Sequence, residues 1–429
     1  MDSTKEAAEC AKRASFGLAA LPLATRNRAL TRIAEELDRR KAEIVLANER
    51  DMDEAKRNNL ASPLLKRLRY DPAKLDESAM QIRSLIDQED PIGKVLSRTE
   101  LDDGLILERV SCPIGVIGIV FESRPDALVQ ISTLCLKSGN AVLLKGGSEA
   151  KRTNEALARA INEAIVGVDP CFEGSVHLLS TRDEFRSLLA LDGLVDLIIP
   201  RGSNELVRSI QETTKIPVLG HAAGICHTYV HEDADVPLAI RVCFDAKVQY
   251  PAVCNAMETL LVNRKVAKDF LPKIASEYER AEVELRGDEL TRTIINAKGA
   301  TEADWATEYN DLVLAIKVVD TLDEAISHIN NYSSHHTDAI ITRSKEVAER
   351  FMALVDSASV MWNCSTRFAD GFRYGLGAEV GISTNKTHAR GPVGLEGLTI
   401  YKWKLRGEGQ IVADYVGENA KGFTHRRLQ

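Results

Sequence analysis

The chain has 429 residues, of which 44% are hydrophobic and 28% charged, and 55 Lys and Arg against 63 Asp and Glu give a formal net charge of −8. This composition is that of a globular protein of two or three domains and speaks against disordered or fibrous architectures. The absence of a basic block argues against nucleic-acid binding, and no apolar run approaches the ~18 residues of a membrane-spanning helix. A charged N-terminus and eight cysteines without a CxxC pair predict a cytoplasmic protein with reduced thiols.

Helices are predicted for residues 1 to about 60, where apolar side chains recur at helical spacing. The Asp-Gly pair at 103–104 stands between two short alternating runs and predicts a β-hairpin. From residue 115, short apolar strands alternate with helices, which predicts a parallel, doubly wound sheet. A second α/β unit follows from about residue 235, and 398–407 returns to β character. The predicted strands are 115–121, 141–145, 175–180, 194–200, 216–220, 258–262, 312–319, 338–342 and 359–363.

Two loops between strands and helices are candidates for a nucleotide site, KGGS at 145–148 and GS at 202–203. Free backbone N–H groups and a lysine at the carboxyl edge of a sheet suit a phosphate group. No GxGxxG follows a strand and no GxxxxGK[ST] occurs, so each loop alone is ordinary α/β loop chemistry. Two such loops on one sheet favour a cofactor.

Cys254 is the candidate nucleophile among the cysteines. It lies in a loop between a predicted helix at about 236–248 and a strand. Backbone N–H groups are free at such a junction, where they stabilise a thiolate and later an oxyanion. A lone cysteine is more often a small buried hydrophobe, and the cysteines at 112, 135, 226, 243 and 364 are interpreted in that way.

The histidines do not predict a metal site. His221, Cys226 and His227 lie close together in the sequence, but no further ligand follows at a spacing usual for zinc. The pair His335-His336 is interpreted as part of a solvated loop.

The polar, Gly-rich stretch 363–384 follows the last strand of the second unit. Asn363, Ser365, Thr366 and Arg367 emerge where that strand ends, which is the usual place for ligand contacts in such sheets. The alternative is a long surface loop, although loops of this length without structure of their own are more often functional or mobile.

Longer segments carry a resemblance to a known family, among them PIGVIGIVFESRPDALVQ, PRGSNELV, VLGHAAGICHTYVHEDAD, VCNAMETLLV, STRFADGFRYGLGAEVGIST and HARGPVGLEGLT. By these segments the chain resembles, nearly end to end, the gamma-glutamyl phosphate reductase (glutamate-5-semialdehyde dehydrogenase) family of the aldehyde dehydrogenase superfamily. The resemblance implies an α/β fold with two doubly wound parallel-sheet domains and a β oligomerisation arm. The cofactor domain would comprise 1–97 and 113–232, the catalytic domain 233–393, and the arm 98–112 and 394–412.

Taken residue by residue, the resemblance implies that Cys254 is the nucleophile and that Lys145 contacts the adenosine ribose of the cofactor. Gly202 and Ser203 match the pair near the pyrophosphate. Where NAD-preferring relatives often carry a glutamate, this chain has Ser148, whose neutral side chain does not repel a 2′-phosphate. The predicted cofactor is therefore NADP(H).

Further matches concern the reacting end of the site. Glu308 takes the position of the carboxylate that holds the nicotinamide ribose. His221 stands where the superfamily's general-base glutamate would fall, and Ser123 near the Asn of its oxyanion hole. A reductase that starts from an acyl phosphate needs no activated water, so the loss of that glutamate fits. Arg124 and Arg367 are the candidates for binding the phosphate and the substrate carboxylate, because arginine can clamp either one bidentately.

The implied activity is NADPH-dependent reduction of gamma-glutamyl phosphate to glutamate-5-semialdehyde and phosphate through a cysteine thioester, the second step of proline synthesis from glutamate. Two alternatives stay open: a hydrolytic NAD(P)-dependent semialdehyde dehydrogenase, disfavoured by His221 and Ser148, and a non-catalytic scaffold, disfavoured by Cys254 and Lys145. Exposed β edges predict at least a dimer, and the labile substrate suggests a transient contact with glutamate 5-kinase. Cys364, where the family's loop is expected to carry Ala, is expected to pack near the site without a role.

Overall fold

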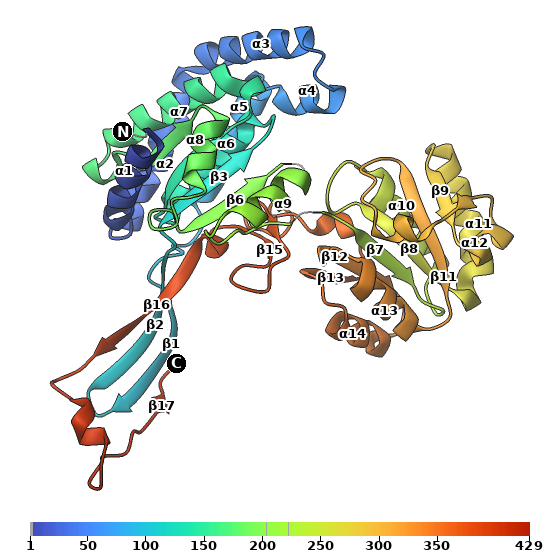
Figure 1. Ribbon diagram of the computed structural model, residues 1–429. Coiled ribbons are helices and arrows are strands. Elements are labelled where there is room, and N and C mark those ends of the chain that lie inside the picture. The colour runs from blue at the N-terminus through green and yellow to red at the C-terminus, as the bar shows by residue number, and fades with distance from the viewer. Residues whose placement is uncertain (1–2, 203, 222) are drawn as a thin grey trace.

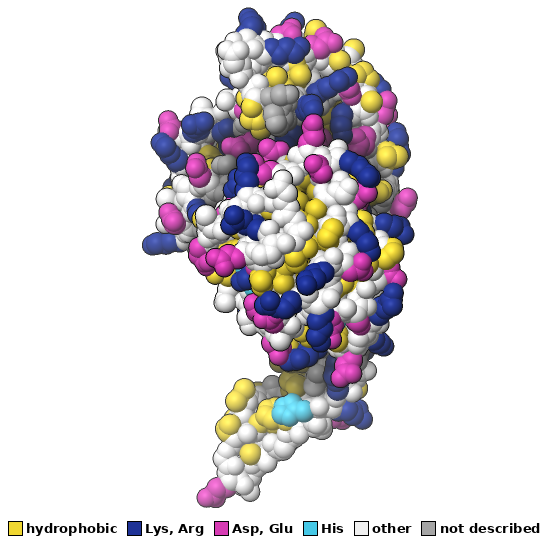
Figure 2. Space-filling view, turned by 90° about the vertical axis from the view of Figure 1, so that its right-hand side faces the viewer, with side chains coloured by type: hydrophobic (Ala, Val, Ile, Leu, Met, Phe, Trp, Pro, Cys, Tyr) yellow, Lys and Arg dark blue, Asp and Glu magenta, His cyan; other side chains and the backbone are white. Residues whose placement is uncertain are grey.

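The structure is a computed structural model that describes residues 3–202, 204–221 and 223–429. Figure 1 shows a helix-rich first domain, a second α/β domain beside it, and a β arm that projects away from both and carries the C-terminus. Among the described residues, none of the helices combines the length and apolar character that a membrane crossing requires. Figure 2 shows Lys and Arg interspersed with Asp and Glu over one face, with hydrophobic side chains on the arm below.

The first domain is built on a four-stranded parallel sheet in the order β5-β4-β3-β6. Its strands are buried on both faces because helices cover both sides, which explains their unbroken apolar runs. The strand predicted at 216–220 is reduced to a single bridge between Ile198 and Val218. The elements are α1 (Ser3–Leu18), α2 (Leu23–Arg39), α3 (Lys41–Arg57), α4 (Ser62–Leu68), α5 (Pro72–Ile86), β3 (Val116–Phe121), α6 (Pro125–Lys137), β4 (Ala141–Lys145), η1 (Ser148–Ala150), α7 (Lys151–Val166), η2 (Pro170–Phe172), β5 (Val176–Leu179), α8 (Arg182–Leu188), β6 (Leu197–Arg201) and α9 (Asn204–Thr213).

The second domain holds a seven-stranded sheet in the order β10-β9-β11-β8-β7-β12-β13, in which every neighbouring pair is parallel. Its carboxyl edge therefore gathers the ends of strands that lie far apart in the sequence. The elements are β7 (Cys226–Val230), α10 (Val236–Val248), β8 (Met257–Asn263), α11 (Arg264–Arg280), β9 (Glu284–Gly287), α12 (Glu289–Ile294), β10 (Lys298–Gly299), η3 (Glu302–Ala306), β11 (Val313–Val319), α13 (Leu322–Tyr332), β12 (Thr337–Ile341), α14 (Lys345–Leu354), β13 (Ser359–Trp362) and η4 (Thr366–Phe368).

The chain crosses between these two domains earlier than the sequence predicted. Strand β7 pairs with β8 and β12 in the second sheet, although it precedes the predicted start at residue 233. On the way back, Val380 and Val393 pack in the core of the first domain, although 233–393 was predicted to be one domain. Both crossings occur in loops whose amino-acid composition is similar to that of the neighbouring segments. No composition shift therefore marks either domain boundary in the sequence. The returning segment includes β14 (Ile382–Ser383), β15 (Gly391–Pro392) and η5 (Glu396–Leu398).

The arm confirms the predicted hairpin at 103–104, where Asp102 pairs with Leu105. Its sheet has the order β16-β2-β1-β17, so β16 is an edge strand that pairs along its length with β2. The side chains of Tyr401 and Trp403 are exposed on β16. The arm continues beyond its predicted end at residue 412. Its elements are β1 (Val95–Asp102), β2 (Leu105–Pro113), β16 (Thr399–Arg406), η6 (Val412–Tyr415) and β17 (Arg426–Arg427).

Candidate active site

Cys254 lies in the turn that connects α10 to β8. The N–H of Ala256 donates to the carbonyl of Val253 at 2.9 Å and closes this turn. The Cys226 thiol donates to the Cys254 carbonyl at 3.2 Å, so that carbonyl is held away from the solvent side. The backbone N–H of Cys254 has no acceptor among the described residues. The half-buried thiol thus sits beside an N–H that is available for an oxyanion.

Gly224 holds this turn by direct backbone contact. A Cβ at Gly224 would lie 2.2 Å from the carbonyl oxygen and 2.4 Å from the Cα of Cys254, which no side-chain rotation relieves. We expect Gly224→Ala to displace Cys254 and lower turnover at least about tenfold, because sub-ångström misplacement of a reacting group is costly. Gly220→Ala is the matched control, since its Cβ would meet Pro200 at an ordinary 3.5 Å. Equal turnover of the two variants in a steady-state assay would contradict this role for Gly224.

Two histidines lie beside the thiol. One ligand atom each from His221, Cys254 and His336 lie within 4.8 Å of one another, and the imidazole centroids are 4.8 Å apart with an interplanar angle of 75°. The interpretation of His336 as part of a solvated loop is wrong, because this residue directly precedes β12 and is fully buried. His221 and His227 were weighed together as ligands, but the structure separates them. His227 pairs through Nδ1 with Asp338, at 3.1 Å.

Each imidazole uses Nδ1 for a hydrogen bond, and Nδ1 of His336 also lies 3.8 Å from the sulfur of Cys226. Nδ1 of His221 is 2.8 Å from the carbonyl oxygen of Ile382, and Nδ1 of His336 is 2.9 Å from the Thr337 hydroxyl. Nε2 of His336 is buried and has no partner among the described residues. Burial lowers the pKa of His221, against the opposing effects of the Ile382 carbonyl and the Glu308 charge, so its imidazole is neutral near pH 7.

Arginines supply positive charge next to Cys254. Arg367 in η4 is 8% exposed, and its Nε donates to the Gln249 side chain at 3.0 Å. Arg201, at the end of β6, was missed by the sequence analysis, although it directly precedes the Gly-Ser pair that was singled out. Its Nη1 is buried without a partner among the described residues. Burial, followed by the positive charge of Arg124, lowers the pKa of Arg201, whereas Cys254 acts in the opposite direction.

A buried carboxyl completes this charged group. Glu379 lies near both Arg201 and Arg124, and burial raises its pKa, while Arg201 opposes the shift. The N–H of Gly371 donates to the Glu379 carboxylate at 2.8 Å. Arg124 also pairs with Asp126 at 3.0 Å. The three guanidinium groups of Arg201, Arg124 and Arg367 outnumber the carboxylates of Glu379 and Asp126. This excess of positive charge suits a ligand with two anionic groups.

Three of the residues predicted to contact substrate or the oxyanion use their polar side-chain atoms elsewhere. The N–H and hydroxyl of Ser123 both donate to Glu149 at 2.6 Å, so this hydroxyl is directed to a carboxylate and not to an oxyanion. Asn363 pairs with Thr342, accepting from its N–H at 3.0 Å and donating to its carbonyl at 2.9 Å. Ser365 caps η4 by accepting the N–H of Arg367. By contrast, the hydroxyl of buried Thr366 has no partner among the described residues.

The cofactor candidates lie at the carboxyl edge of the first sheet. The chain leaves β3 toward β4 and β5, then returns to the other side of β3 as β6, so a switch point lies between β3 and β6. Lys145 ends β4, is 8% exposed and donates to the Gly146 carbonyl, and burial lowers its pKa. A Cβ at Gly202 would lie 2.7 Å from the Cδ2 methyl of Leu206 and 3.0 Å from Oε2 of Glu122, so the glycine keeps this turn uncrowded. Ser148 opens η1, and Ser203 lies outside the described residues. A buried cation and an open glycine turn at a switch point fit a dinucleotide phosphate.

Glu308 connects the two domains. Its carboxylate accepts from the Asn204 side chain at 2.9 Å, at the start of α9. Its charge also acts on His221 beside the thiol. The residue predicted to hold the nicotinamide ribose, Glu308, therefore links the second domain to α9 of the first domain through its hydrogen bond with Asn204. A cavity of about 330 Å³ adjoins this region and is lined by Arg208, Gln211, Gly220, His221, Ala223, Ile225, Ser334, Thr384 and Asn385.

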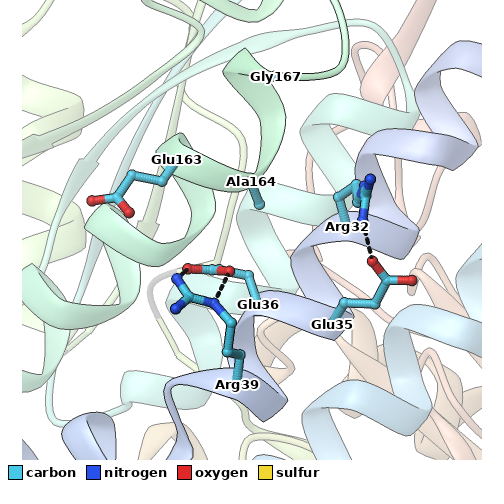
Figure 3. Close-up of a pocket in the computed structure, with 7 residues that line it drawn as sticks. All are labelled: Arg32, Glu35, Glu36, Arg39, Glu163, Ala164 and Gly167. Atoms are coloured by element: carbon cyan, nitrogen blue, oxygen red, sulfur yellow. Dashed lines mark hydrogen bonds and ion pairs between the residues drawn. The ribbon is translucent and has the colours of Figure 1, made fainter.

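A second pocket, of about 340 Å³, lies on the outer side of the first domain between α2 and α7 (Figure 3). Its charged groups pair with one another: Arg32 with Glu35 at 2.9 Å, and Arg39 with Glu36 at 2.5 Å. The hydrogen bond from Arg39 lowers the pKa of Glu36 to about 2, although burial opposes it. These charges are satisfied within the protein surface, so this pocket is not the candidate site.

Comparison with known proteins identifies the family and the fold. The aldehyde dehydrogenase family matches residues 2–304. A relative from Pelotomaculum thermopropionicum, named gamma-glutamyl phosphate reductase, is 58% identical over 425 residues, which are 99% of this chain and 97% of its own length. The crystal structure of gamma-glutamyl phosphate reductase from Thermotoga maritima is 42% identical, with a TM-score of 0.93 over 96% of this chain and 100% of its own. An engineered glycolyl-CoA reductase with bound NADP+ shares the fold at 14% identity, with a TM-score of 0.65 over 94% of this chain and 96% of its own.

Proposed function

Because the chain belongs to the aldehyde dehydrogenase family and is closely similar to its gamma-glutamyl phosphate reductases, we propose that it reduces gamma-glutamyl phosphate to glutamate-5-semialdehyde and phosphate. The reaction uses NADPH and a thioester on Cys254, and serves proline synthesis in the cytoplasm. The observation that carries this proposal is the thiol of Cys254 set between two imidazoles and the buried guanidinium groups of Arg201 and Arg367.

The covalent step uses the groups around the thiol. The thiol proton passes to the imidazole pair of His221 and His336, and the thiolate attacks the acyl carbon. The backbone N–H of Cys254 holds the oxyanion of the tetrahedral intermediate, because Ser123 is engaged by Glu149. The bond from the acyl carbon to the phosphate oxygen then breaks, and inorganic phosphate leaves a thioester on the protein.

The two anionic groups of the substrate are held by arginine. Arg367 and Arg201 both interact electrostatically with Cys254, which supports their assignment to the acyl phosphate bound there. Arg124 lies next to Arg201 and serves the remaining anion. An unpaired anion in a closed cleft is costly, which is why several buried cations are needed.

The cofactor site is formed by Lys145, the glycine turn at Gly202, and Glu308. When bound, NADPH supplies the hydride that reduces the thioester. Lys145, at the end of β4, would contact the adenosine ribose and its 2′-phosphate, and Glu308 would hold the nicotinamide ribose. After reduction, the thiohemiacetal releases the aldehyde and returns the thiol.

Cofactor choice gives a first test. Ser148 is neutral, so it does not add to the charges of Glu149 and Glu122 that already act near Lys145. We expect a higher kcat/KM for NADPH than for NADH, and Ser148→Glu to lower that ratio at least about tenfold, because a like charge next to a 2′-phosphate costs on the order of 1.4 kcal/mol or more. Ser148→Gln, of similar size and no charge, should keep the preference for NADPH. Equal kcat/KM values in the wild-type protein would contradict this assignment.

We also propose that the arm forms a subunit contact. Strand β16 leaves one edge unpaired and exposes Tyr401 and Trp403, a combination that invites strand pairing with a second copy. We expect the full chain to be at least a dimer by light scattering at micromolar concentration. Deletion of 399–429 should yield monomers or aggregates, whereas deletion of 413–429, which keeps β16, should leave the dimer. A monomeric full-length chain would contradict the proposal.

The function itself is tested in the forward direction. Gamma-glutamyl phosphate is too labile to store, so it is generated in the assay from glutamate and ATP by a glutamate kinase. NADPH consumption should then depend on kinase, ATP and this protein together, with semialdehyde formed in equal amount. NADPH consumption without semialdehyde, or none at all, would reject the reductase.

A further inference from the structure

We propose that His221, Cys254 and His336 form a reversible binding site for a thiophilic divalent cation of the Zn²⁺ type, and that the bound cation blocks the thiol. Binding of the cation follows from the geometry alone. The block rests on the proposed function, because it matters only if Cys254 is the nucleophile.

The spacing of the three side chains fits such a cation. Their candidate ligand atoms lie within 4.8 Å of one another. With Zn–S and Zn–N bonds of about 2.3 and 2.0 Å, ligand atoms in a tetrahedral zinc site are roughly 3.3–3.6 Å apart. The three groups therefore need to close by about 1 Å, which side-chain rotation of a half-buried cysteine and histidine provides.

The surroundings of both imidazoles are those of metal ligands. A histidine that binds a metal through one nitrogen usually directs the other to a carbonyl or another acceptor, which fixes the ring. Here Nδ1 of His221 contacts the Ile382 carbonyl at 2.8 Å and Nδ1 of His336 contacts the Thr337 hydroxyl at 2.9 Å. Nε2 of His336 is buried without a partner among the described residues. An unpaired buried polar atom destabilises the protein, and a bound cation would remove this cost by coordinating the nitrogen.

The ligand set also decides which cation binds and how strongly. One thiolate and two imidazoles favour Zn²⁺ over Mg²⁺ or Ca²⁺, which prefer oxygen ligands. Three protein ligands leave a fourth position for water, as in open zinc sites. The charges of Arg201 and Arg367 lie near the thiol and oppose a dication, whereas Glu308 and Glu379 near His221 favour it. This balance predicts a site that is weaker than a structural zinc site and releases its cation to a chelator.

Cobalt provides the test, because a Co²⁺–thiolate bond gives a near-ultraviolet charge-transfer band that reports the sulfur ligand directly. The full-length protein is first stripped with a chelator and then titrated with Co²⁺. We expect one equivalent to produce the band, and Zn²⁺ to abolish it. Cys254→Ala should remove the band, and His336→Ala should weaken Co²⁺ binding at least about tenfold. Circular dichroism of each variant checks that it is folded.

His335→Asn is the matched control. Nδ1 of His335 contacts the Asp356 carbonyl at 2.7 Å, and its φ of 60° is one that asparagine tolerates. This variant should keep both the band and the affinity. A band that persists in Cys254→Ala, or equal Co²⁺ affinity in the wild type and His336→Ala, would overturn the site.

Inhibition is measured separately from binding. In the forward assay, Zn²⁺ should inhibit the wild type at the concentrations that displace Co²⁺, and a chelator should restore the activity. A cobalt band without inhibition of an active enzyme would overturn the block. If the protein has the band but no reductase activity at all, the cation site stands and the proposed function fails.

Discussion

We expect Cys254→Ala to fold normally and to lose reduction, with turnover below about 1% of the wild type. Loss of the covalent route forces a direct reduction of the acyl phosphate, and a hundredfold loss corresponds to about 2.7 kcal/mol of barrier, well within the several kcal/mol that nucleophilic catalysis supplies. The fold should persist because the turn is held by backbone contacts from Gly224 and Ala256, not by the thiol. Steady-state turnover and circular dichroism give the two readings.

Cys364→Ala is the control for this prediction. Cys364 packs against the small apolar cluster of Ala339, Met361 and Ala369, and burial raises the pKa of its thiol, so it stays protonated and unreactive. We expect this variant to keep most of its activity. Turnover above about 1% in Cys254→Ala would reject the thioester route, and inactivation by Cys364→Ala would point to the wrong cysteine.

The second prediction concerns the reverse reaction, in which glutamate-5-semialdehyde is oxidised to a thioester on Cys254. Without phosphate we expect at most one NADPH per active site, and with phosphate or arsenate sustained turnover. His221 stands where the superfamily's water-activating glutamate would fall, and its Nδ1 is engaged with the Ile382 carbonyl, so we expect water to be poorly activated against the thioester. The oxyanion nucleophile is instead held by the buried arginines next to the thiol.

Arg201→Gln sharpens this experiment. It removes a cation whose Nη1 is free among the described residues, and should raise the KM for phosphate at least about tenfold while leaving the single-turnover burst intact. Arg350→Gln is the control, since among the described residues Arg350 pairs only with Asp323, on the exposed surface of the second domain, at 2.7 Å. Sustained NADPH formation in a phosphate-free assay at neutral pH would mean that water attacks the thioester, and the hydrolytic dehydrogenase would replace the reductase.

Local patterns in the sequence determined most of the fold and predicted Cys254 as the nucleophile. Eight strands were predictable because both faces of a parallel sheet are buried, which leaves continuous apolar runs: β3, β4, β5, β6, β8, β11, β12 and β13. The strands β7, β9 and β10 were missed, since their short or polar segments carry no such run. The hairpin at 103–104 was predictable because Asp-Gly matches the backbone of a tight turn. Cys254 was predictable because a polar loop between a helix and a strand is itself a local signal.

Only the tertiary structure decided which distant residues complete the site. His336 is 82 positions from Cys254 in the sequence and lies near it because the two residues precede β12 and β8, the parallel strands on either side of β7. Arg201 comes from the other domain, and although it directly precedes the predicted cofactor loop at 202–203, only the packing of the two domains brings it toward Cys254. Asn363 was predicted to bind substrate because it is a polar residue at the end of a strand. In the structure its side chain instead makes two hydrogen bonds with the backbone of Thr342, at the end of the adjacent strand. Periodicity encodes which face of an element is buried, whereas the partners of a polar side chain depend on strand order and domain packing, which no local pattern contains.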